Sequence, residues 1–165
     1  LISRNGETYL WYFPDGKPSS VETSTSPEAK PTDGWGSSAM LYALVEGLAG
    51  VQDKDKLFRR VRLCPKWLSA GVEKADVKID YKSSGAYVKY AYSHTRDQLI
   101  INLSGSYEYI QLSLPVPGNY TAGDLMIGGK KKKYIMASFN QSSYLIADAD
   151  VKGECEIILD LRKKP

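Results

Sequence analysis

The chain has 165 residues, of which 42% are hydrophobic and 25% are charged, a composition typical of a globular domain. No stretch approaches the roughly 20 consecutive apolar residues that a membrane-spanning helix needs. The net charge is +3, and the run from Lys130 to Lys133 alone supplies four positive charges. Without that run the balance would be slightly negative, so the composition excludes a broadly basic nucleic-acid-binding surface.

Residue counts narrow the possible chemistry further. Twelve Tyr and three Trp stand against three Phe, a bias common in β-rich proteins and at sugar-contacting surfaces. The single histidine, His94, excludes a metal site built from several histidines, and we expect neither a metal nor a cofactor. Cys64 and Cys155 are too few for a disulfide scaffold. They form either one bridge or two buried thiols, and the thiols are favoured.

The N-terminal part of the chain predicts little regular structure. Residues 7–13 form a short aromatic run typical of a strand, which ends at the turn Pro14-Asp15-Gly16. From Pro14 to Gly34 there is almost no large apolar residue, which indicates a long functional loop or a connector. The chain begins Leu1-Ile2 without an initiator Met or signal peptide, so we expect it to be a segment of a longer protein.

One helix is predicted, over residues 37–50. Ser37 or Ser38 can cap its start and Gly50 can end it. Glu46 is its only charged residue, so the helix is apolar nearly all round. Such a helix belongs inside a helical assembly, and the rest of the chain predicts no second helix. We therefore expect its packing partners to lie elsewhere, either in the same parent protein or in a second copy that associates through helix 37–50.

After the helix the apolar period changes to two, which predicts a mostly β fold, an antiparallel β-sandwich with one N-terminal helix and a long N-terminal loop. Strands are predicted at 57–63, 75–81, 86–92, 98–103, 107–114, 125–127, 133–139 and 155–161. In the third of these, Tyr90 and Tyr92 share one face and Tyr87 points to the other. The predicted domains are 1–51, the end of a helical part, and 52–165, the sandwich.

The segment around Trp35 carries the candidate binding site. Asp33-Gly34-Trp35-Gly36 places an indole between glycines at a helix start, beside free backbone N–H groups. A flat aromatic surface next to hydrogen-bond donors suits a sugar ring, whose faces are apolar and whose rim carries hydroxyls. Trp35 and Asp33 are therefore candidate substrate-binding residues. The alternative is that Trp35 only closes the end of the helix.

The remaining polar motifs predict surface features rather than catalytic residues. His94 is expected in an exposed turn between two strands, and residues 128–133, Gly-Gly-Lys-Lys-Lys-Lys, at a hairpin tip whose lysines stay in water. The acidic pairs 53/55 and 148/150 are expected in solvated turns. A glycosidase needs two facing carboxyl groups, and no convincing pair is evident.

A longer stretch resembles a known family. The segment from Gly34 through Gly50 to Val51 resembles the last inner helix of six-hairpin glycosidases with an (α/α)6 barrel, such as bacterial α-L-rhamnosidases and disaccharide phosphorylases. Residues 58–65, Phe-Arg-Arg-Val-Arg-Leu-Cys-Pro, resemble the segment that leaves this barrel and begins a C-terminal β-sandwich. The resemblance covers about one fifth of the chain, from Gly34 to Pro65. The sandwich that follows is similar only in pattern.

This resemblance implies an accessory domain of a bacterial carbohydrate-active enzyme, with the barrel of the parent chain as its partner. Inner helices of that barrel begin at the sugar cleft, so Trp35 and Asp33 would lie at its rim or floor. The family's general acid and base precede this segment, so it would not be catalytic alone. Asp33 departs from the family's usual residue before the Trp. A periplasmic or secreted location is expected.

Two rival interpretations remain. One is a freestanding carbohydrate-binding module that stacks sugars on a tyrosine-rich face. The tyrosines concerned are Tyr87, Tyr90, Tyr92, Tyr107 and Tyr109. The other is a cell-surface interaction domain of the immunoglobulin-like sort.

Overall fold

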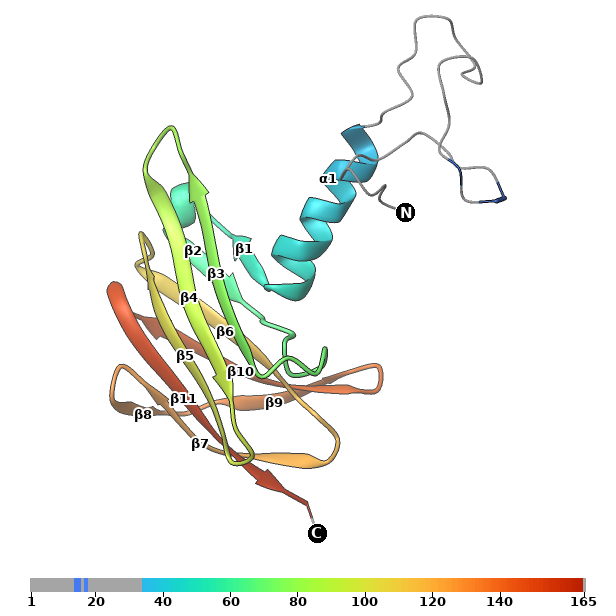
Figure 1. Ribbon diagram of the computed structural model, residues 1–165. Helices are drawn as coiled ribbons and strands as arrows, with labels where there is room; N and C mark the ends of the chain where they lie inside the picture. Colours follow the sequence, from blue (N-terminus) through green and yellow to red (C-terminus); the bar gives the residue numbers. More distant parts are fainter. Residues whose placement is uncertain (1–13, 16, 18–33, 165) are drawn as a thin grey trace, which may run out of the picture. The chain divides into compact units, whose positions relative to one another are not determined.

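The computed structural model describes residues Pro14, Asp15 and Lys17 and the range 34–164. The chain divides into two compact units, Leu1–Leu44 and Val45–Pro165, and each is described by itself. In the first unit the α-helix α1 spans Gly34–Tyr42. The second unit is a β-sandwich (Figure 1), which confirms the predicted fold class. The predicted domain boundary at 51/52 stays a prediction, and the expected strand at 7–13 lies outside the described residues.

The sandwich is built from strands joined mostly by short turns. Its elements are η2 (Ala43–Leu48, a π-type helical turn that begins in the first unit), β1 (Val51–Asp53), η3 (Lys56–Phe58, a 3₁₀ turn), β2 (Arg60–Leu63), β3 (Lys74–Tyr81), β4 (Ala86–His94), β5 (Gln98–Gly105), β6 (Tyr109–Val116), β7 (Tyr120–Ile127), β8 (Lys130–Lys132), β9 (Ile135–Phe139), β10 (Ser142–Asp150) and β11 (Gly153–Lys163).

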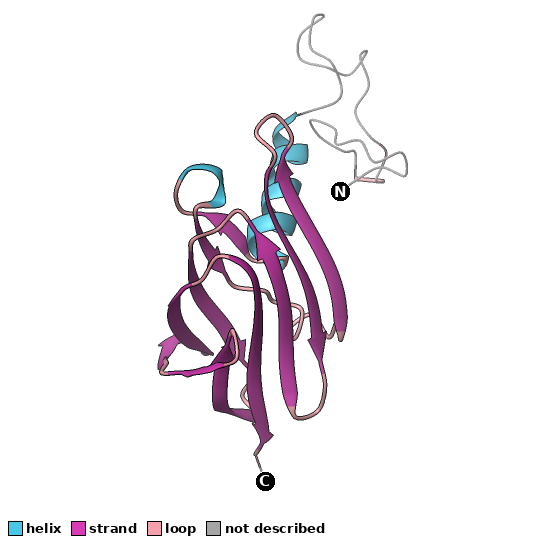
Figure 2. Ribbon diagram, turned by 90° about the vertical axis from the view of Figure 1, so that its left-hand side faces the viewer, coloured by secondary structure: helices cyan, strands magenta, loops and turns pink. Residues whose placement is uncertain are grey.

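Two sheets face each other across the core. The five-stranded sheet has the order β1-β2-β6-β10-β9, and the six-stranded sheet has the order β3-β4-β5-β11-β7-β8. Among the described strands, every neighbouring pair is antiparallel except β2 and β6, which run parallel. Figure 2 shows that strands make up most of this unit. The chain returns to the same two layers repeatedly, as in other antiparallel sandwiches.

The core forms because alternate residues of each strand point between the sheets. On β4, Val88, Tyr90 and Tyr92 are at most 2% exposed, while Lys89 between them is exposed. The other strands bury the remaining core residues, among them Val61, Leu63, Leu99, Ile101, Leu103, Ile110, Leu112, Leu114, Leu125, Ile127, Leu145, Ile157 and Leu159. Each large aliphatic side chain contributes about 1.5–3 kcal/mol by leaving water, so this layer dominates the stability of the unit.

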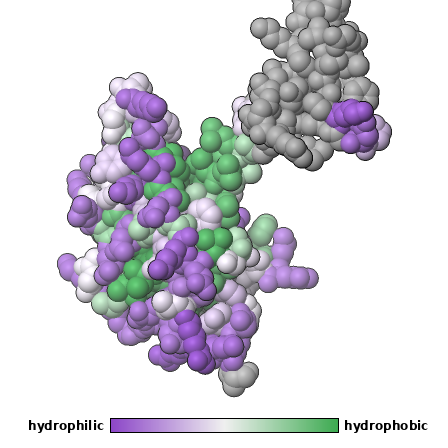
Figure 3. Space-filling view, viewed as in Figure 1, coloured by the Kyte–Doolittle hydropathy of each residue, from purple (hydrophilic) through white to green (hydrophobic). Residues whose placement is uncertain are grey.

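The outer faces are more polar. On β3 every second residue, from Lys74 through Asp76 and Lys78 to Asp80, is charged and exposed. In the space-filling view the surface over β3 and β4 is mainly hydrophilic (Figure 3). The predicted division of the tyrosines on β4 is confirmed, since Tyr90 and Tyr92 are buried and Tyr87 is only partly buried.

Several predicted elements differ from the structure. Strand β10 was not predicted, and Asp148 and Asp150 lie on it rather than in a turn. The predicted strand 57–63 begins only at Arg60, because Leu57 and Phe58 both have left-handed backbone angles. The predicted strand 133–139 begins only at Ile135, as β9. The hairpin tip expected over 128–133 is confirmed at Gly128-Gly129, whereas the first three lysines form the strand β8.

The helix also begins earlier than predicted. Helix α1 starts at Gly34, so Ser37 and Ser38 lie inside it and do not cap it. The helical turns end at Leu48, and Gly50 follows with a φ of +69°. The prediction that Gly50 ends the helical segment is therefore confirmed to within two residues.

Buried tyrosines predict how the sandwich responds to alkali. Burial raises the pKa of Tyr90, Tyr92 and Tyr107, that of Tyr92 to about 12. An unfolded chain releases these protons near the ordinary pKa of 10. Their contribution to stability is therefore complete below pH 10 and is lost as the pH rises above it. In a spectrophotometric titration we expect these three phenols to ionise only together with loss of the circular dichroism of the fold.

The variant Tyr92→Phe removes one of these phenols and should move alkaline unfolding to higher pH. If all twelve tyrosines ionised in one reversible step near pH 10 while the fold persisted, the assigned burial would be contradicted.

Candidate functional site

The two predicted binding residues are only partly within the described chain. Asp33 lies outside the described residues. Trp35 lies in the first turn of α1, and its side chain is outside what the structure describes. Their role at a sugar cleft therefore stays a prediction. The site that can be built from described residues lies in the sandwich.

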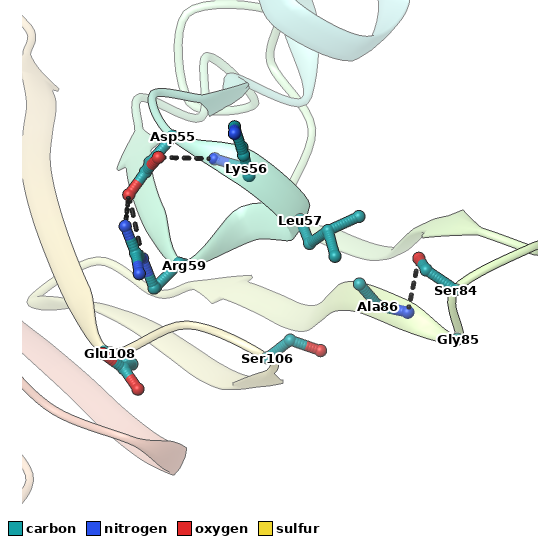
Figure 4. A pocket seen from close by; sticks show the side chains of 9 residues that line it. All are labelled: Asp55, Lys56, Leu57, Arg59, Ser84, Gly85, Ala86, Ser106 and Glu108. Carbon is teal, nitrogen blue, oxygen red and sulfur yellow. Dashed lines mark hydrogen bonds and ion pairs between the residues drawn. The ribbon is translucent and has the colours of Figure 1, made fainter.

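A cleft of about 650 Å³ lies at the end of the sandwich where η3, the β3–β4 turn and the β5–β6 connection meet (Figure 4). Its lining residues are Asp55, Lys56, Leu57, Arg59, Ser84, Gly85, Ala86, Ser106 and Glu108. It thus contains two carboxylates, two cationic side chains and two hydroxyls. Figure 4 shows that Asp55 is bonded to Lys56 and Arg59 on one side, and Ser84 to Ala86 on the other.

The carboxylates of the cleft are already neutralised. Asp55 caps η3 by accepting from the Lys56 backbone N–H at 2.8 Å, and it accepts from Arg59 Nε and Nη2 at 2.9 and 2.5 Å. The hydrogen bond from Arg59 is the main cause that lowers the pKa of Asp55. Glu108 is paired with Lys152 at 3.3 Å. A general acid for glycoside cleavage needs a raised pKa, so Asp55 is unsuited to that role.

An aromatic stack fixes the loop that carries Asp55. Leu57 and Phe58 have φ values of +57° and +60°, which cost residues with a Cβ roughly 1–2 kcal/mol each. Phe58 is 3% exposed and stacks on Tyr81 with ring centroids 4.7 Å apart. The Tyr81 hydroxyl donates to Asp53 at 3.2 Å. This packing offsets the backbone strain and leaves Leu57 half exposed in the cleft.

The hydroxyls of the cleft also have structural partners. Ser84 Oγ donates to the Tyr81 carbonyl at 3.2 Å and accepts from the Ala86 N–H at 3.3 Å. Ser106 Oγ accepts from the Tyr87 N–H at 3.2 Å. The polar groups of the cleft thus serve mainly to close loops on one another. Among the described residues, the cleft holds no nucleophile with an activating base.

A second polar cluster lies where the helical turns pass into the sandwich; we call it the junction, formed by Leu48, Ala49, Gly50, Cys64, Lys66, Trp67 and Tyr90. Three successive carbonyl groups at the end of η2 accept hydrogen bonds there. The Lys66 N–H donates to Leu48 at 2.9 Å, Tyr90 Oη to Ala49 at 2.7 Å and the Cys64 N–H to Gly50 at 2.7 Å. Carbonyls at the end of a helix have no partner within it, so the sandwich supplies them.

A buried side-chain relay completes the junction. Trp67 Nε1 donates to Tyr90 Oη at 2.8 Å, and Tyr90 Oη donates onward to Ala49. Tyr90 is fully buried, and its bond to Ala49 is shielded from water, while the bond from Trp67 is partly buried. The relay joins β4 of one sheet to the segments that precede β1 and follow β2 of the other. It therefore ties the two sheets together.

The junction explains the spacing of the segment that resembles six-hairpin glycosidases. β1 pairs with β2 in an antiparallel hairpin, with Val51 opposite Leu63, and this brings Gly50 against Cys64 and Pro65. A Cβ added to Gly50 would lie 1.9 Å from the Cys64 carbonyl oxygen. Only glycine fits there, so the Gly and the Cys-Pro pair belong to one close backbone contact.

The surroundings of His94 and of the two cysteines do not fit a catalytic role. His94 ends β4 instead of lying in an exposed turn, and its ring meets Tyr120 edge-on at 6.3 Å. Its Nε2 is buried without a hydrogen-bond partner among the described residues. Cys64 and Cys155 are free thiols, the alternative favoured by the sequence. In the described ranges, no group of three or more His, Cys, Asp and Glu residues could hold a metal ion.

The tyrosine-rich face of the rival module is not available for stacking. Tyr90, Tyr92 and Tyr107 are at most 2% exposed, and the Tyr107 hydroxyl donates to the Leu103 carbonyl inside the core. Tyr109 contacts Arg60, whose guanidinium lies 4.7 Å from the ring centroid.

No helix in the described part is long and apolar enough to cross a membrane.

Comparisons with known proteins give little guidance on family. No family model matches the chain, and no curated protein matches it. Among solved structures the chain is similar to the α-L-rhamnosidase from Dictyoglumus thermophilum, with a TM-score of 0.47 and 11% sequence identity. The similarity covers 68% of this chain and 12% of that chain, so this chain spans only a small part of that protein's length.

The junction predicts a contrast between two tyrosines of β4. Tyr90→Phe leaves the buried Ala49 carbonyl and the partly buried Trp67 N–H without this partner, which should lower the free energy of unfolding by about 1–3 kcal/mol. Tyr92→Phe is the matched control, since the Tyr92 hydroxyl is buried with no partner among the described residues. It should be neutral or slightly stabilising. Urea unfolding of both variants measures the difference, and equal losses would contradict the relay.

Glycine positions give a second test of the junction. Gly50→Ala places a Cβ against the Cys64 carbonyl and should destabilise well beyond the roughly 1–2 kcal/mol that a left-handed backbone costs by itself. Gly85→Ala is the control, because Gly85 has a similar φ of +70° and no atom within 4 Å of the added Cβ. Thermal unfolding should separate the two variants clearly. A Gly50 variant no less stable than the Gly85 variant would show that the contact with Cys64 is wrong.

Proposed function

We propose that this chain is the C-terminal accessory β-sandwich of a carbohydrate-active enzyme of the six-hairpin glycoside hydrolase type. It supports the catalytic barrel of the parent chain and is not catalytic alone. The observation that carries the proposal is the junction, in which the sandwich binds the carbonyls of Leu48, Ala49 and Gly50, where the incoming helical segment ends. The resemblance of residues 34–65 to the segment that leaves such a barrel agrees with it.

A supporting domain needs a connection without a free hinge. A single flexible residue between two domains allows them to reorient, since its φ and ψ are unconstrained. Here Leu48, Ala49 and Gly50 are each held by a hydrogen bond from a different part of the sandwich. The direction in which the chain enters the sandwich is thereby fixed from residue 48 onward. This is the property expected of a domain that stiffens its neighbour.

The expectation that the isolated chain is not catalytic is supported by the state of the two carboxylates in the described cleft. Asp55 is ionised and held by Arg59, and Glu108 is paired with Lys152. Hydrolysis with either stereochemical outcome requires a protonated acid on one side of the bond and a free carboxylate on the other. The cleft provides neither. In the parent enzyme, Trp35 and Asp33 would add one wall to a cleft completed by other residues.

A freestanding carbohydrate-binding module is the weaker proposal. Such a module needs exposed aromatic rings that stack on a sugar, and the three central tyrosines of the proposed platform are buried. Without them the face offers only Tyr87 and Tyr109, which lie on strands of different sheets. An immunoglobulin-like interaction domain has no specific support in the described residues.

The proposal predicts inactivity in isolation and a stabilising effect in the parent. The purified chain should not hydrolyse a panel of aryl glycosides, and calorimetric titration with oligosaccharides should show millimolar binding or none. The coding region upstream of Leu1 should encode a long series of helical hairpins. In that parent enzyme, Tyr90→Phe should lower the temperature of thermal inactivation, whereas Tyr92→Phe should not.

Three results would contradict this proposal. Glycoside hydrolysis by the isolated chain would show a complete active site. Micromolar sugar binding that is lost when an exposed sandwich tyrosine is changed to Ala would favour the freestanding module. An upstream region that encodes no helical domain would remove the partner that the sandwich is proposed to support.

A further inference from the structure

Strand β9 is an edge strand with exposed apolar side chains. It is the last strand of the five-stranded sheet and, among the described strands, pairs with β10 alone, so its other side offers backbone groups to a further strand. Ile135, Met136 and Phe139 on this strand are 65%, 50% and 72% exposed. Tyr134, the residue before β9, is held in place, because its Oη donates to the carbonyls of Ala122 and Gly123 at 3.2 and 2.9 Å. An ordered apolar edge is therefore open to water.

The other three sheet edges are protected against pairing. Strand β1 has three residues and ends in Asp53, and β8 consists of three lysines. Strand β3 carries a charged residue at every second position. Short length and charge are the usual devices that keep edges from pairing with another chain. β9 alone has no charge and no proline. Because the same molecule protects its other edges, the open edge of β9 indicates a partner.

We propose that the partner is a second copy of this chain, which pairs its own β9 antiparallel to the first across a twofold axis at Ala137. The two five-stranded sheets then continue into one another. The pairing satisfies the free backbone groups of both copies at once. It needs no other component, and it is independent of the accessory role proposed above.

The sequence of β9 is complementary to itself in this arrangement. The axis at Ala137 places Ile135 of one copy opposite Phe139 of the other, and Met136 opposite Ser138. In the register with β10, Met136 faces the buried Leu145, so Ile135, Ala137 and Phe139 share the outer face of the sheet. Each Ile–Phe pair is thus an aromatic–β-branched pair on one face, which is among the favourable cross-strand combinations. No like charges meet.

The size of the contact sets its strength. A stable interface usually buries about 800 Å² on each partner, and five strand residues supply only a part of this area. We therefore expect a weak, reversible dimer whose population rises with concentration, rather than an obligate one. The same protein should be mainly monomeric when dilute.

Helix α1 is the competing surface for self-association. Leu41 and Tyr42 are both 62% exposed, and association through helix 37–50 is the alternative that the sequence suggests. The two routes differ in the residues they require. A charge on β9 breaks the proposed dimer, and a charge on α1 breaks only the helical one.

Light scattering coupled to size exclusion tests the proposal with three proteins. The unaltered chain should approach twice the monomer mass as the concentration rises toward about 0.5 mM. Phe139→Lys should stay monomeric at every concentration, with unchanged circular dichroism, because the side chain is exposed and lies outside the core. Leu41→Lys is the matched control, at an exposed apolar residue of α1, and should dimerise like the unaltered chain.

Cross-linking tests the twofold register. Residues opposite each other on antiparallel strands have Cα atoms about 4.5–5.5 Å apart, within the range of a disulfide. Ala137→Cys should therefore give a dimer on non-reducing gels after mild oxidation, and the unaltered chain, with its own two thiols, should not. A monomeric unaltered chain at high concentration, or a dimer broken by Leu41→Lys and kept by Phe139→Lys, would overturn the proposal.

Discussion

The hydroxyl of Tyr90 is the contact on which the arrangement of this sandwich most depends. It accepts from Trp67 and donates to the carbonyl of Ala49, so one buried oxygen joins three segments that are far apart in the sequence. Apolar packing alone holds two sheets together but does not fix one direction for an entering chain, since dispersion has little directionality. The relay supplies that direction. Removing the Tyr90 hydroxyl from water costs free energy, and this cost is offset because the hydroxyl forms hydrogen bonds with both the Trp67 N–H and the Ala49 carbonyl.

The period-two pattern predicted the strands whose two faces differ most. On β3, β4 and β5 the inner residues are apolar and most of the outer ones are polar, so the alternation could be read directly. β10 lacks this contrast, because Ala147 and Ala149 are small inner residues and Tyr144 and Ile146 lie on the outer face. Its aspartates are typical of turns, yet here they point to solvent from a strand. The pattern also did not predict the left-handed backbone of Leu57 and Phe58, since this conformation is stabilised by the ring of Tyr81, which is distant in the sequence.

The candidate site could also be predicted only in part from the sequence. The spacing of Gly50 and Pro65 could be recognised as a resemblance, but its cause is a backbone contact formed when β1 folds onto β2. Tyr90 is 41 residues from Ala49, and no local rule pairs an isolated tyrosine with a particular carbonyl at that distance. Sequence reasoning placed Tyr90 on the correct face and could go no further. What it missed was the polar role of a residue that it had assigned to an aromatic face.

The order of strands in the five-stranded sheet makes the two proposed interactions compatible. The junction adjoins β1 at one edge of this sheet, and β9 forms the opposite edge, with β2, β6 and β10 between them. A second copy at β9 therefore does not compete for the carbonyls of Leu48, Ala49 and Gly50, which lie beside β1. If β9 instead bordered the junction, a second copy would lie against these groups. The topology thus allows the sandwich to bind the entering residues 48–50 beside one edge of the sheet and to be extended at the other edge.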